Sequence, residues 1–258
     1  MNFAPAAMPR SALVTGGAQR LGRAIALRLA SEGWNVAVHY LDSPEAALAT
    51  VGDLRALGVQ AVAVQHDLQS DAPVVPLLDA CEAALGPLQC LVNNAARFEF
   101  DTAADFSLTG FDAHMRINVA APVRLAQALH ARLPEAARGV VINLLDQKLW
   151  NPNPDFLSYT LSKAALEAAT GLLARALAPR LRVVGVAPGI SASAPGQSAA
   201  GFAAAHKATP LGRSSTPEDV AAAVAFLATA AAVTGTTLLV DGGQHLLPTT
   251  RDILFLTA

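Results

Sequence analysis

Short apolar runs alternate with longer alanine- and leucine-rich stretches along the whole 258-residue chain. The short runs have the length and β-branching of buried strands, and the stretches between them have the spacing of helices. Strands that alternate with helices indicate an α/β fold built on a parallel sheet, here as one domain over residues 1–258. The predicted strands are Ser11–Val14, Asn35–Tyr40, Ala61–Gln65, Leu88–Val92, Val140–Leu145, Arg182–Val186 and Thr237–Val240.

Capping and turn residues place the helices between these strands. Ser43 followed by Pro44 is a good cap and first position for a helix that would run to Gly58. Thr216–Pro217–Glu218–Asp219 starts another helix in the same way. The remaining helices are predicted from the first glycine turn to about residue 31, and at residues 71–85, 108–133 and 158–173.

Composition and charge exclude several classes of protein. The formal net charge is -2, and no basic stripe suggests nucleic acid or a lipid surface as a partner. The apolar stretch Ala221–Val233 is too short to span a bilayer, so it is predicted to be a buried helix and the loop after it. The opening MNFAPAAMPR does not resemble a secretory signal, so we expect a flexible terminus over residues 1–10 and a cytoplasmic protein.

The two cysteines do not form a motif. Cys81 falls in a predicted helix and Cys90 in a predicted strand, with no CxxC spacing and no histidine-rich partner sequence. We expect two packed, reduced thiols. The six histidines are scattered and lack an HExxH pattern, so no metal site is expected.

The candidate chemistry lies between Val140 and Glu167. Tyr159 and Lys163 stand four residues apart at the start of a predicted helix, so both side chains project from one face. Asp146 follows the preceding strand, at the sheet edge where open α/β folds bind ligands. A nearby ammonium lowers the pKa of a phenol, so Tyr159 is predicted to exchange a proton near neutral pH. A YxxxK tetrapeptide also arises by chance, so it needs support from other motifs.

The first strand leads directly into a glycine turn, TGGAQRLG, at Thr15–Gly22. A strand, a glycine turn and a helix can hold phosphate oxygens against backbone N–H groups at the positive end of the helix dipole. Gly16 and Gly22 permit close backbone approach there. This position in the first βαβ unit predicts nucleotide binding.

Taken together, these motifs resemble the short-chain dehydrogenase/reductase family over nearly the whole chain. The matching residues are Thr15–Gly22, Asp67–Leu68, Asn93–Asn94–Ala95, Asn118, Tyr159 with Lys163, Pro188–Gly189 and Asp241–Gly242–Gly243. The resemblance implies a doubly wound parallel sheet of seven strands with helices on both faces. It also implies a nicotinamide cofactor, a homotetramer, and a C-terminal tail, here Asp252–Leu256, that packs at a subunit interface.

The resemblance also assigns the site residues. Asp146, Tyr159, Lys163 and Asn118 are the expected catalytic residues, with Asn118 at a helix distortion that holds a relay water near Lys163. Residues 190–214, rich in alanine, serine and glycine, are expected to form a substrate loop, although a tolerated surface insertion would look the same. The expected cofactor-binding residues are Gly16, Arg20, Leu21, Gly22, Tyr40, Ser43, Asp67, Leu68, Asn94, Ala95, Tyr159, Lys163, Pro188, Gly189 and Ser191.

Three departures from the common family pattern resemble the pteridine reductase branch. Asp146 replaces the usual serine thirteen residues before the tyrosine, and Arg20 replaces a glycine. Phe98 stands where pteridine reductases have an aromatic residue that stacks on the pterin. An acid suits reduction of a C=N bond, because a proton must reach nitrogen. Arg20, Phe98, Asp146 and Tyr159 are therefore the expected substrate-binding residues, although Asp146 could be a surface residue and Phe98 a core residue.

The end of the second strand predicts NADPH as the cofactor. NAD-preferring members usually have an acidic residue where this chain has Tyr40, and Arg20 and Ser43 could bind a 2′-phosphate. Asp42 weakens this prediction, because its carboxylate must turn to solvent. The main alternative function is a carbonyl reductase acting on an oxoacyl thioester or small ketone. A noncatalytic nucleotide sensor is the second, but it has no need of the proton relay.

Overall fold

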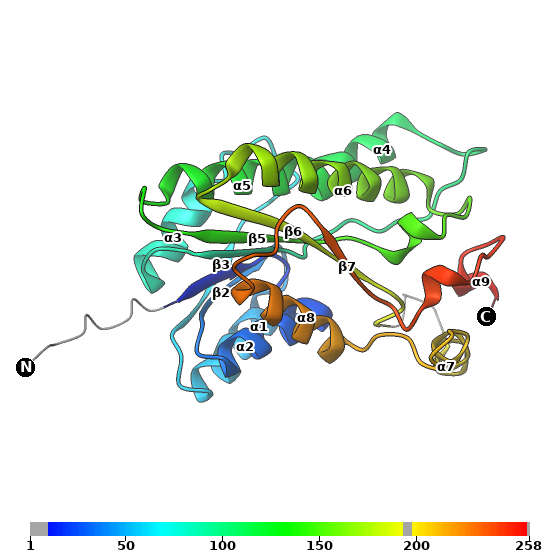
Figure 1. Ribbon diagram of the computed structural model, residues 1–258, viewed down its shortest axis with the longest axis horizontal. Coiled ribbons are helices and arrows are strands. Elements are labelled where there is room, and N and C mark those ends of the chain that lie inside the picture. The colour runs from blue at the N-terminus through cyan, green and yellow to red at the C-terminus, as the bar shows by residue number, and fades with distance from the viewer. Residues whose placement is uncertain (1–9, 193–197, 257–258) are drawn as a thin grey trace, which may run out of the picture.

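The computed structural model describes residues 10–192 and 198–256. A parallel sheet lies in the middle, with helices on both faces (Figure 1). The predicted flexible terminus lies outside the described residues except for Arg10, which is hydrogen-bonded to Glu32 and Asn35. Residues 193–197 of the predicted substrate loop are also outside the described part.

The sheet has seven parallel strands in the order β3-β2-β1-β4-β5-β6-β7, which confirms the predicted doubly wound fold. The strand order reverses between β1 and β4, and ligands in such folds bind outside the carboxyl ends of the strands at that point. The strands are β1 (Ser11–Val14), β2 (Asn35–Tyr40), β3 (Ala61–Gln65), β4 (Cys90–Asn93), β5 (Gly139–Leu144), β6 (Leu181–Pro188) and β7 (Thr237–Val240).

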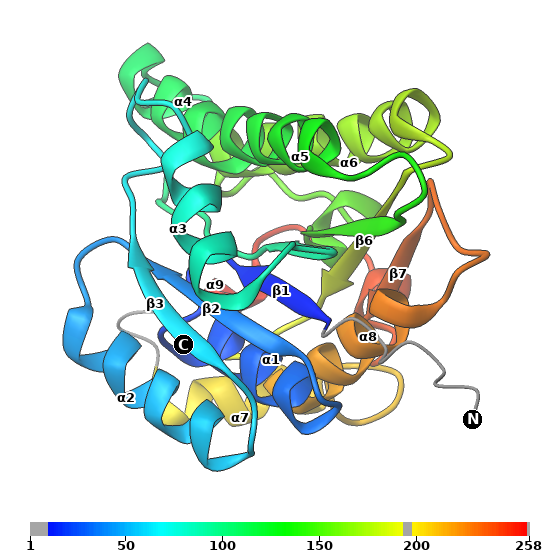
Figure 2. The ribbon, with the colours of Figure 1, turned by 90° about the vertical axis from the view of Figure 1, so that its left-hand side faces the viewer.

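The helices form a layer on each side of the sheet. α1, α2 and α8 cover one face, and α3, α4, α5 and α6 cover the other (Figure 2). Their bounds are α1 (Arg20–Ser31), α2 (Pro44–Ala56), α3 (Val75–Leu85), α4 (Leu108–Met115), α5 (Ala121–Arg132), α6 (Leu157–Leu177), α7 (Ala199–Lys207), α8 (Pro217–Thr229) and α9 (Ile253–Leu256). The predicted capping box of α8 is present, with Thr216 and Asp219 bonding reciprocally.

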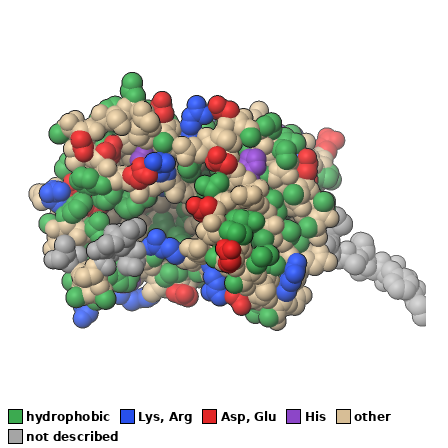
Figure 3. All heavy atoms as spheres, turned by 180° about the vertical axis from the view of Figure 1, so that it is seen from behind, with side chains coloured by type: hydrophobic (Ala, Val, Ile, Leu, Met, Phe, Trp, Pro, Cys, Tyr) green, Lys and Arg blue, Asp and Glu red, His purple; other side chains and the backbone are tan. Residues whose placement is uncertain are grey.

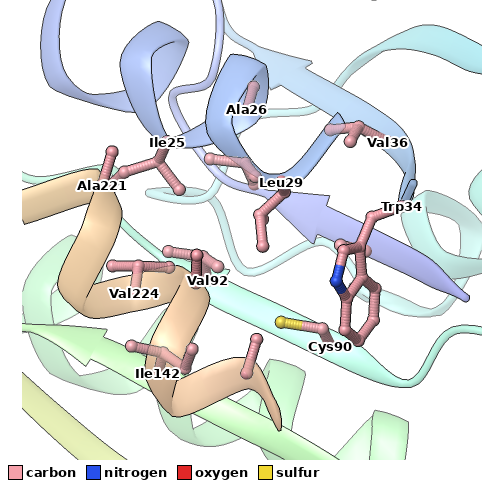
Figure 4. Packing of buried hydrophobic residues seen from close by; sticks show 14 of the residues in the cluster. Ile25, Ala26, Leu29, Trp34, Val36, Cys90, Val92, Ile142, Ala221 and Val224 are labelled. Atoms are coloured by element: carbon pink, nitrogen blue, oxygen red, sulfur yellow. The ribbon is translucent and has the colours of Figure 1, made fainter. Parts of the chain in front are cut away.

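Each face of the sheet buries its own apolar cluster. On the α1 and α8 side, Ile25 and Leu29 pack with Val224 against Val92 and Ile142 of the sheet (Figure 4). Both cysteines belong to these clusters as free buried thiols, as predicted. Burial raises the pKa of each thiol to about 12, which keeps both in the unreactive protonated form.

The long helix predicted over residues 108–133 contains a break in its hydrogen-bond ladder. A π-helical turn, η1 (Arg116–Ala120), joins α4 to α5, and the buried Asn118 lies in it. This is the distortion that the resemblance implied. Wide turns of this kind often occur at functional sites.

Two helix starts differ from the prediction. α3 begins at Val75 rather than Asp71, with Pro76 in its first turn, where the missing N–H of a proline leaves no helix hydrogen bond unmade. Ser43 does occupy the cap position of α2. Its hydroxyl nevertheless donates to the Asp42 carboxylate (3.2 Å) instead of accepting a helix N–H.

The predicted substrate loop over residues 190–214 is not all loop. Its alanine-rich part forms α7, which Ser198 caps by accepting the Gly201 N–H (2.9 Å). Alanine is the strongest helix former, and a capped run of it folds even without a large apolar face. α7 and α9 lie beside each other near the carboxyl edge of the sheet (Figure 1).

Candidate active site

A cavity of about 600 Å³ opens at the carboxyl edge of the sheet. A hollow with charged side chains of both signs around it is also visible on the face seen in Figure 3. Every residue predicted to bind cofactor or substrate lines this one cavity, as do Asp146, Tyr159 and Lys163 of the predicted catalytic set. The exception among the predicted site residues is Asn118, which does not line it.

The glycine turn after β1 is shaped for close backbone approach. Gly16 has a φ of +61°, a left-handed conformation that glycine adopts without strain. A Cβ on Gly22 would lie 2.1 Å from the Gly16 carbonyl oxygen, so only glycine fits there. No side-chain cap from Gln19 covers the first turn of α1, and that turn lines the cavity. These features suit a pyrophosphate held by backbone N–H groups, so the turn fits a dinucleotide.

The side chains of Asn94, which lines the cavity, and of Thr15 hold this turn in place. The Asn94 amide donates to the carbonyls of Thr15 (2.9 Å) and Gly16 (3.1 Å). The Thr15 hydroxyl accepts the backbone N–H groups of Asn94 (2.9 Å) and Ala95 (3.0 Å). The end of β4 is thereby locked to the turn after β1, which fixes the floor of the cavity at the point where the strand order reverses.

A buried histidine that sequence reasoning missed also holds the turn. His39, at 3% exposure, accepts the Gly16 N–H on Nδ1 (3.1 Å), and its Nε2 lies 2.9 Å from the His66 carbonyl. Because Nδ1 must accept, the ring is neutral with its proton on Nε2. Burial lowers the pKa of His39 from 6.5 to about 4, which agrees with this neutral form.

The protein should therefore lose stability as the pH falls from about 6.5 to about 4. In that window the unfolded chain takes up a proton on residue 39 and the folded chain does not, so folding is penalised by up to roughly 3 kcal/mol. Urea unfolding at a series of pH values should show this slope. His39→Asn, which keeps an acceptor for Gly16, should flatten it, whereas the control His206→Asn on α7 should not. A wild-type slope in His39→Asn would contradict the assignment.

The predicted acid and phenol are in contact. The Tyr159 hydroxyl donates to Asp146 Oδ2 (2.9 Å), and Asp146 Oδ1 accepts the backbone N–H of Lys148 (2.8 Å). Burial is the first cause that raises the pKa of Asp146, opposed by these hydrogen bonds and by Lys163. The structure thus joins strand β5 and helix α6 through one carboxylate–phenol pair, which can hold a proton for transfer.

The predicted effect of Lys163 on the phenol is wrong for this structure. Burial and the Asp146 carboxylate raise the pKa of Tyr159 well above its ordinary value. The ammonium instead donates to the Leu144 carbonyl (2.7 Å) and lies 5.7 Å from the Tyr159 ring centroid. Burial also lowers the pKa of Lys163 to about 8. The charged group closest to the phenol is therefore the acid, so Tyr159 keeps its proton at neutral pH.

The side-chain amide of Asn118 bonds to the Arg97 backbone and the Ser162 hydroxyl and not to the Lys163 ammonium. Its Oδ1 accepts the Arg97 N–H (2.8 Å), and its Nδ2 donates to the Arg97 carbonyl (3.0 Å) and the Ser162 hydroxyl (2.8 Å). These bonds fasten the loop after β4 to η1 and α6. The relay-water role stays a prediction, and the side-chain bonds of Asn118 assign it a positioning role.

Phe98 lies at the cavity with 44% of its surface exposed. One of its faces stacks on Phe156 (ring centroids 4.3 Å apart, planes at 17°), and the Tyr159 ring lies edge-on to it at 4.7 Å. Phe98 is thus not a buried core residue. Arg97, beside it, pairs with Glu99 (2.6 Å) and does not line the cavity.

The residues predicted to distinguish NADPH line the far part of the cavity. Arg20 has a φ of +50°, an uncommon conformation for a residue with a side chain, at the first position of α1. Asp42 is exposed, as expected, but still lines the cavity and accepts the Ser43 hydroxyl. Ser43 must leave this carboxylate before it can bind a phosphate.

Sequence reasoning missed other residues that line the cavity. Lys148 and Asp252 form an ion pair there across 104 positions of sequence, which no local pattern could reveal.

No group of three or more potential metal ligands occurs within residues 10–192 and 198–256. None of the helices in the same ranges is long and apolar enough to cross a membrane.

Several known proteins are similar to this chain in sequence or structure. A family model described as enoyl-(acyl carrier protein) reductase matches residues 16–245. FolM alternative dihydrofolate reductase 1 from Brucella canis, solved in complex with NADP, is 38% identical with a TM-score of 0.87, over 95% of this chain and 97% of that one. The 3beta-hydroxysteroid dehydrogenase 1 of Eggerthella lenta is 36% identical over 93% of this chain and 95% of its own length. The 3-oxoacyl-(acyl-carrier-protein) reductase FabG of Staphylococcus aureus is 33% identical over 93% and 99%.

Proposed function

We propose that this chain, which belongs to the short-chain dehydrogenase/reductase family and uses NADP(H), reduces a C=N bond of a pterin. The observation that carries the proposal is the hydrogen bond from Tyr159 to Asp146. An acid in that position can resupply a proton that the phenol gives to a ring nitrogen. The similarity to the Brucella reductase supports the same substrate class.

The chain's own residues have separate roles in this reaction. NADPH, when bound, supplies a hydride to the ring carbon. Tyr159 gives its hydroxyl proton to the adjacent nitrogen, so the C=N bond becomes a C–N single bond with one new hydrogen on each atom. Asp146, whose pKa is raised by burial, takes up a proton from solvent and passes it to the phenolate. Lys163, held by the Leu144 carbonyl, would bind the nicotinamide ribose and stabilise the transient phenolate.

Phe98 and Arg20 would position the substrate. A flat heteroaromatic ring gains roughly 0.5–1.5 kcal/mol from stacking on an aromatic side chain, beyond the area it buries. Phe98 offers such a surface, since it is exposed at the cavity and fixed from behind by Phe156. Stacking keeps the ring in an orientation suited to hydride transfer. The guanidinium of Arg20 would lie at the polar edge of the pterin and at the cofactor phosphates.

A carbonyl reductase is the second candidate, and the similarity to 3-oxoacyl and steroid enzymes favours it. NADPH consumption should be followed with biopterin, dihydrobiopterin, dihydromonapterin, dihydrofolate and acetoacetyl thioester. Turnover of a pterin with kcat/KM at least about tenfold above that of the thioester is expected, because Asp146 replaces a hydroxyl suited to carbonyls. Turnover of the thioester alone would establish the alternative, and NADPH binding with no turnover would indicate a sensor.

We also propose a homotetramer. Large apolar side chains are exposed on the helices at one side of the sheet, among them Leu108 on α4 (72%) and Leu172 on α6 (71%). Solvent exposure of several such residues on one face is typical of a surface covered by another subunit. Sedimentation velocity at micromolar concentration measures the state directly.

Arg20→Gly should weaken NADPH binding by about tenfold or more, because a charge-assisted hydrogen bond to phosphate contributes roughly 1.5–3 kcal/mol. NADH affinity should stay within about twofold, since that cofactor lacks the 2′-phosphate. Glycine also adopts the φ of +50° without the backbone strain that arginine bears.

The matched control is Arg23→Gln, one turn further along α1. Arg23 pairs with Asp53 on the surface (2.7 Å) and does not line the cavity. Its replacement should leave both cofactor affinities unchanged. Equal losses of NADPH and NADH affinity in Arg20→Gly would show that the guanidinium does not read the phosphate.

A further inference from the structure

The C-terminal residues 251–256 lie against the chain's own loop between β5 and α6. Asp252, Ile253 and Leu254 line the same cavity as the Asp146–Tyr159 pair. The tail was expected at a subunit interface, yet these three residues face the site of their own chain. Any substrate that fills the cavity therefore meets this segment as one of its walls.

A buried lysine fastens that wall. Lys148 is 3% exposed, and its ammonium donates to the Asp155 carbonyl (2.6 Å) and to Asp252 Oδ2 (3.0 Å). It also lies 5.2 Å from the centroid of the Phe156 ring. A charge this deeply buried is costly unless its partners are all present. Removing one partner therefore strongly disfavours the arrangement in which residues 251–256 lie against the loop between β5 and α6.

The backbone of the same lysine reaches the reacting groups. The Lys148 N–H donates to Asp146 Oδ1, while the other carboxylate oxygen holds the Tyr159 phenol. Lys148 thus contacts both Asp146, through its backbone N–H, and Asp252, through its ammonium. A shift of Lys148 would move the acid and the wall together.

A stack of aromatic rings makes a second connection between the tail and the site. Phe255 stacks on Phe156 (6.0 Å, 18°), and Phe156 stacks on Phe98 (4.3 Å, 17°). Arg251 pairs with Asp155 (2.8 Å) and lies 5.0 Å from the Phe255 ring. The exposed ring that would bind a flat substrate is therefore supported from the tail.

We propose that Lys148 is a positioning residue whose ion pair with Asp252 holds residues 251–256 as a wall of the substrate site, and so selects ring-sized substrates over small ones. The inference rests on the proposed reductase function for its kinetic readout. The wall would contact a pterin-sized ring. A small ketone, which occupies only the end of the cavity near Tyr159, would not reach it.

The first test measures how often residues 251–256 open, without any substrate. Hydrogen–deuterium exchange of the NADP-bound protein should show slow exchange in peptides covering residues 248–256. Lys148→Met removes the charge and keeps the length of the side chain, and it should speed exchange there at least about tenfold. The double variant Lys148→Met with Asp252→Asn leaves no unpaired charge, so it reports the loss of the pair alone. Arg213→Gln, which breaks an exposed pair with Asp219 elsewhere, is the control.

The second test separates positioning from a general loss of structure. Lys148→Met should raise KM for a dihydropterin at least about tenfold and lower kcat less, with the KM of a small ketone and the Kd of NADPH within about twofold of wild type. Unchanged exchange in residues 248–256 would overturn the inference, as would an equal change in KM for both substrates. If the wild-type protein turns over no pterin but exchange rises in Lys148→Met, the proposed substrate is wrong, and the inference that the Lys148–Asp252 pair holds residues 251–256 still stands.

Discussion

Replacing Tyr159 by phenylalanine is expected to lower kcat for pterin reduction by about a hundredfold or more, the usual contribution of general acid catalysis. The substitution removes only the hydroxyl that donates to Asp146 and leaves the ring, which contacts Phe98 edge-on. The cavity keeps its shape, so NADPH affinity should change by less than about twofold. Steady-state kinetics and a fluorescence titration of NADPH measure the two quantities.

The chain contains only two tyrosines, and the second is a matched control. Tyr40→Phe makes the same chemical change at the end of β2, where the side chain lines the cavity but lies on a different element from the Asp146–Tyr159 pair. Its kcat should stay within about threefold of wild type, since no proton transfer depends on it. A Tyr159→Phe enzyme with wild-type kcat would remove the phenol from the mechanism.

The strands were predictable because each is a short apolar run between turn residues, although the edge strands β3 and β7 are only partly buried. Four runs match the observed strands residue for residue: Ser11–Val14, Asn35–Tyr40, Ala61–Gln65 and Thr237–Val240. Helix starts were harder to predict. α3 begins four residues later than predicted, just before a proline in its first turn, and α7 forms in a segment whose composition resembles a loop.

The site was predictable to the extent that it depends on spacing. A helix brings residues four apart to one face, so Tyr159 and Lys163 were expected together, and the sheet edge places Asp146 beside them. The electrostatics were not predictable in the same way. The rule that an ammonium lowers the pKa of a phenol fails here because Lys163 donates to a backbone carbonyl and a carboxylate occupies the position beside the hydroxyl.

The remaining features of the site depend on contacts between residues that are far apart in the sequence. His39 meets Gly16 only because β2 lies beside β1, and Lys148 meets Asp252 only because the tail folds back on the loop after β5. No periodicity or motif encodes either pair. Both pairs involve a buried polar group, which is where sequence patterns are least informative, because the partner decides whether burial is tolerated.

Asp146→Ser is expected to separate the two candidate reactions. Serine restores the residue usual in the family, and its hydroxyl can still accept the Lys148 N–H that Asp146 now accepts. Serine cannot supply the proton that converts the Tyr159 phenolate back to the phenol. Reduction of a pterin C=N bond should therefore lose about a hundredfold in kcat, while reduction of a small ketone should change by less than about tenfold.

The reason lies in the proton balance of the carboxylate–phenol pair. Burial raises the pKa of Asp146, so this acid holds a proton more readily than an exposed aspartate does. After Tyr159 has given its proton to the ring nitrogen, the phenolate needs a nearby donor, and Asp146 is within 2.9 Å. A carbonyl substrate also takes one hydride and one proton, which Tyr159 gives to its oxygen, but that oxygen is additionally polarised by a hydroxyl, which serine provides.

Asp146→Asn is the isosteric comparison. Its amide keeps the shape and an acceptor for Lys148 but has no titrating proton, so it should lose pterin activity to the same extent as Asp146→Ser. Burst kinetics with excess substrate should then show a slowed turnover, with NADPH binding as in wild type. Equal losses on the pterin and the ketone in Asp146→Ser would mean that the acid serves the fold of the site and not C=N chemistry. Full pterin activity in Asp146→Asn would lead to the same conclusion.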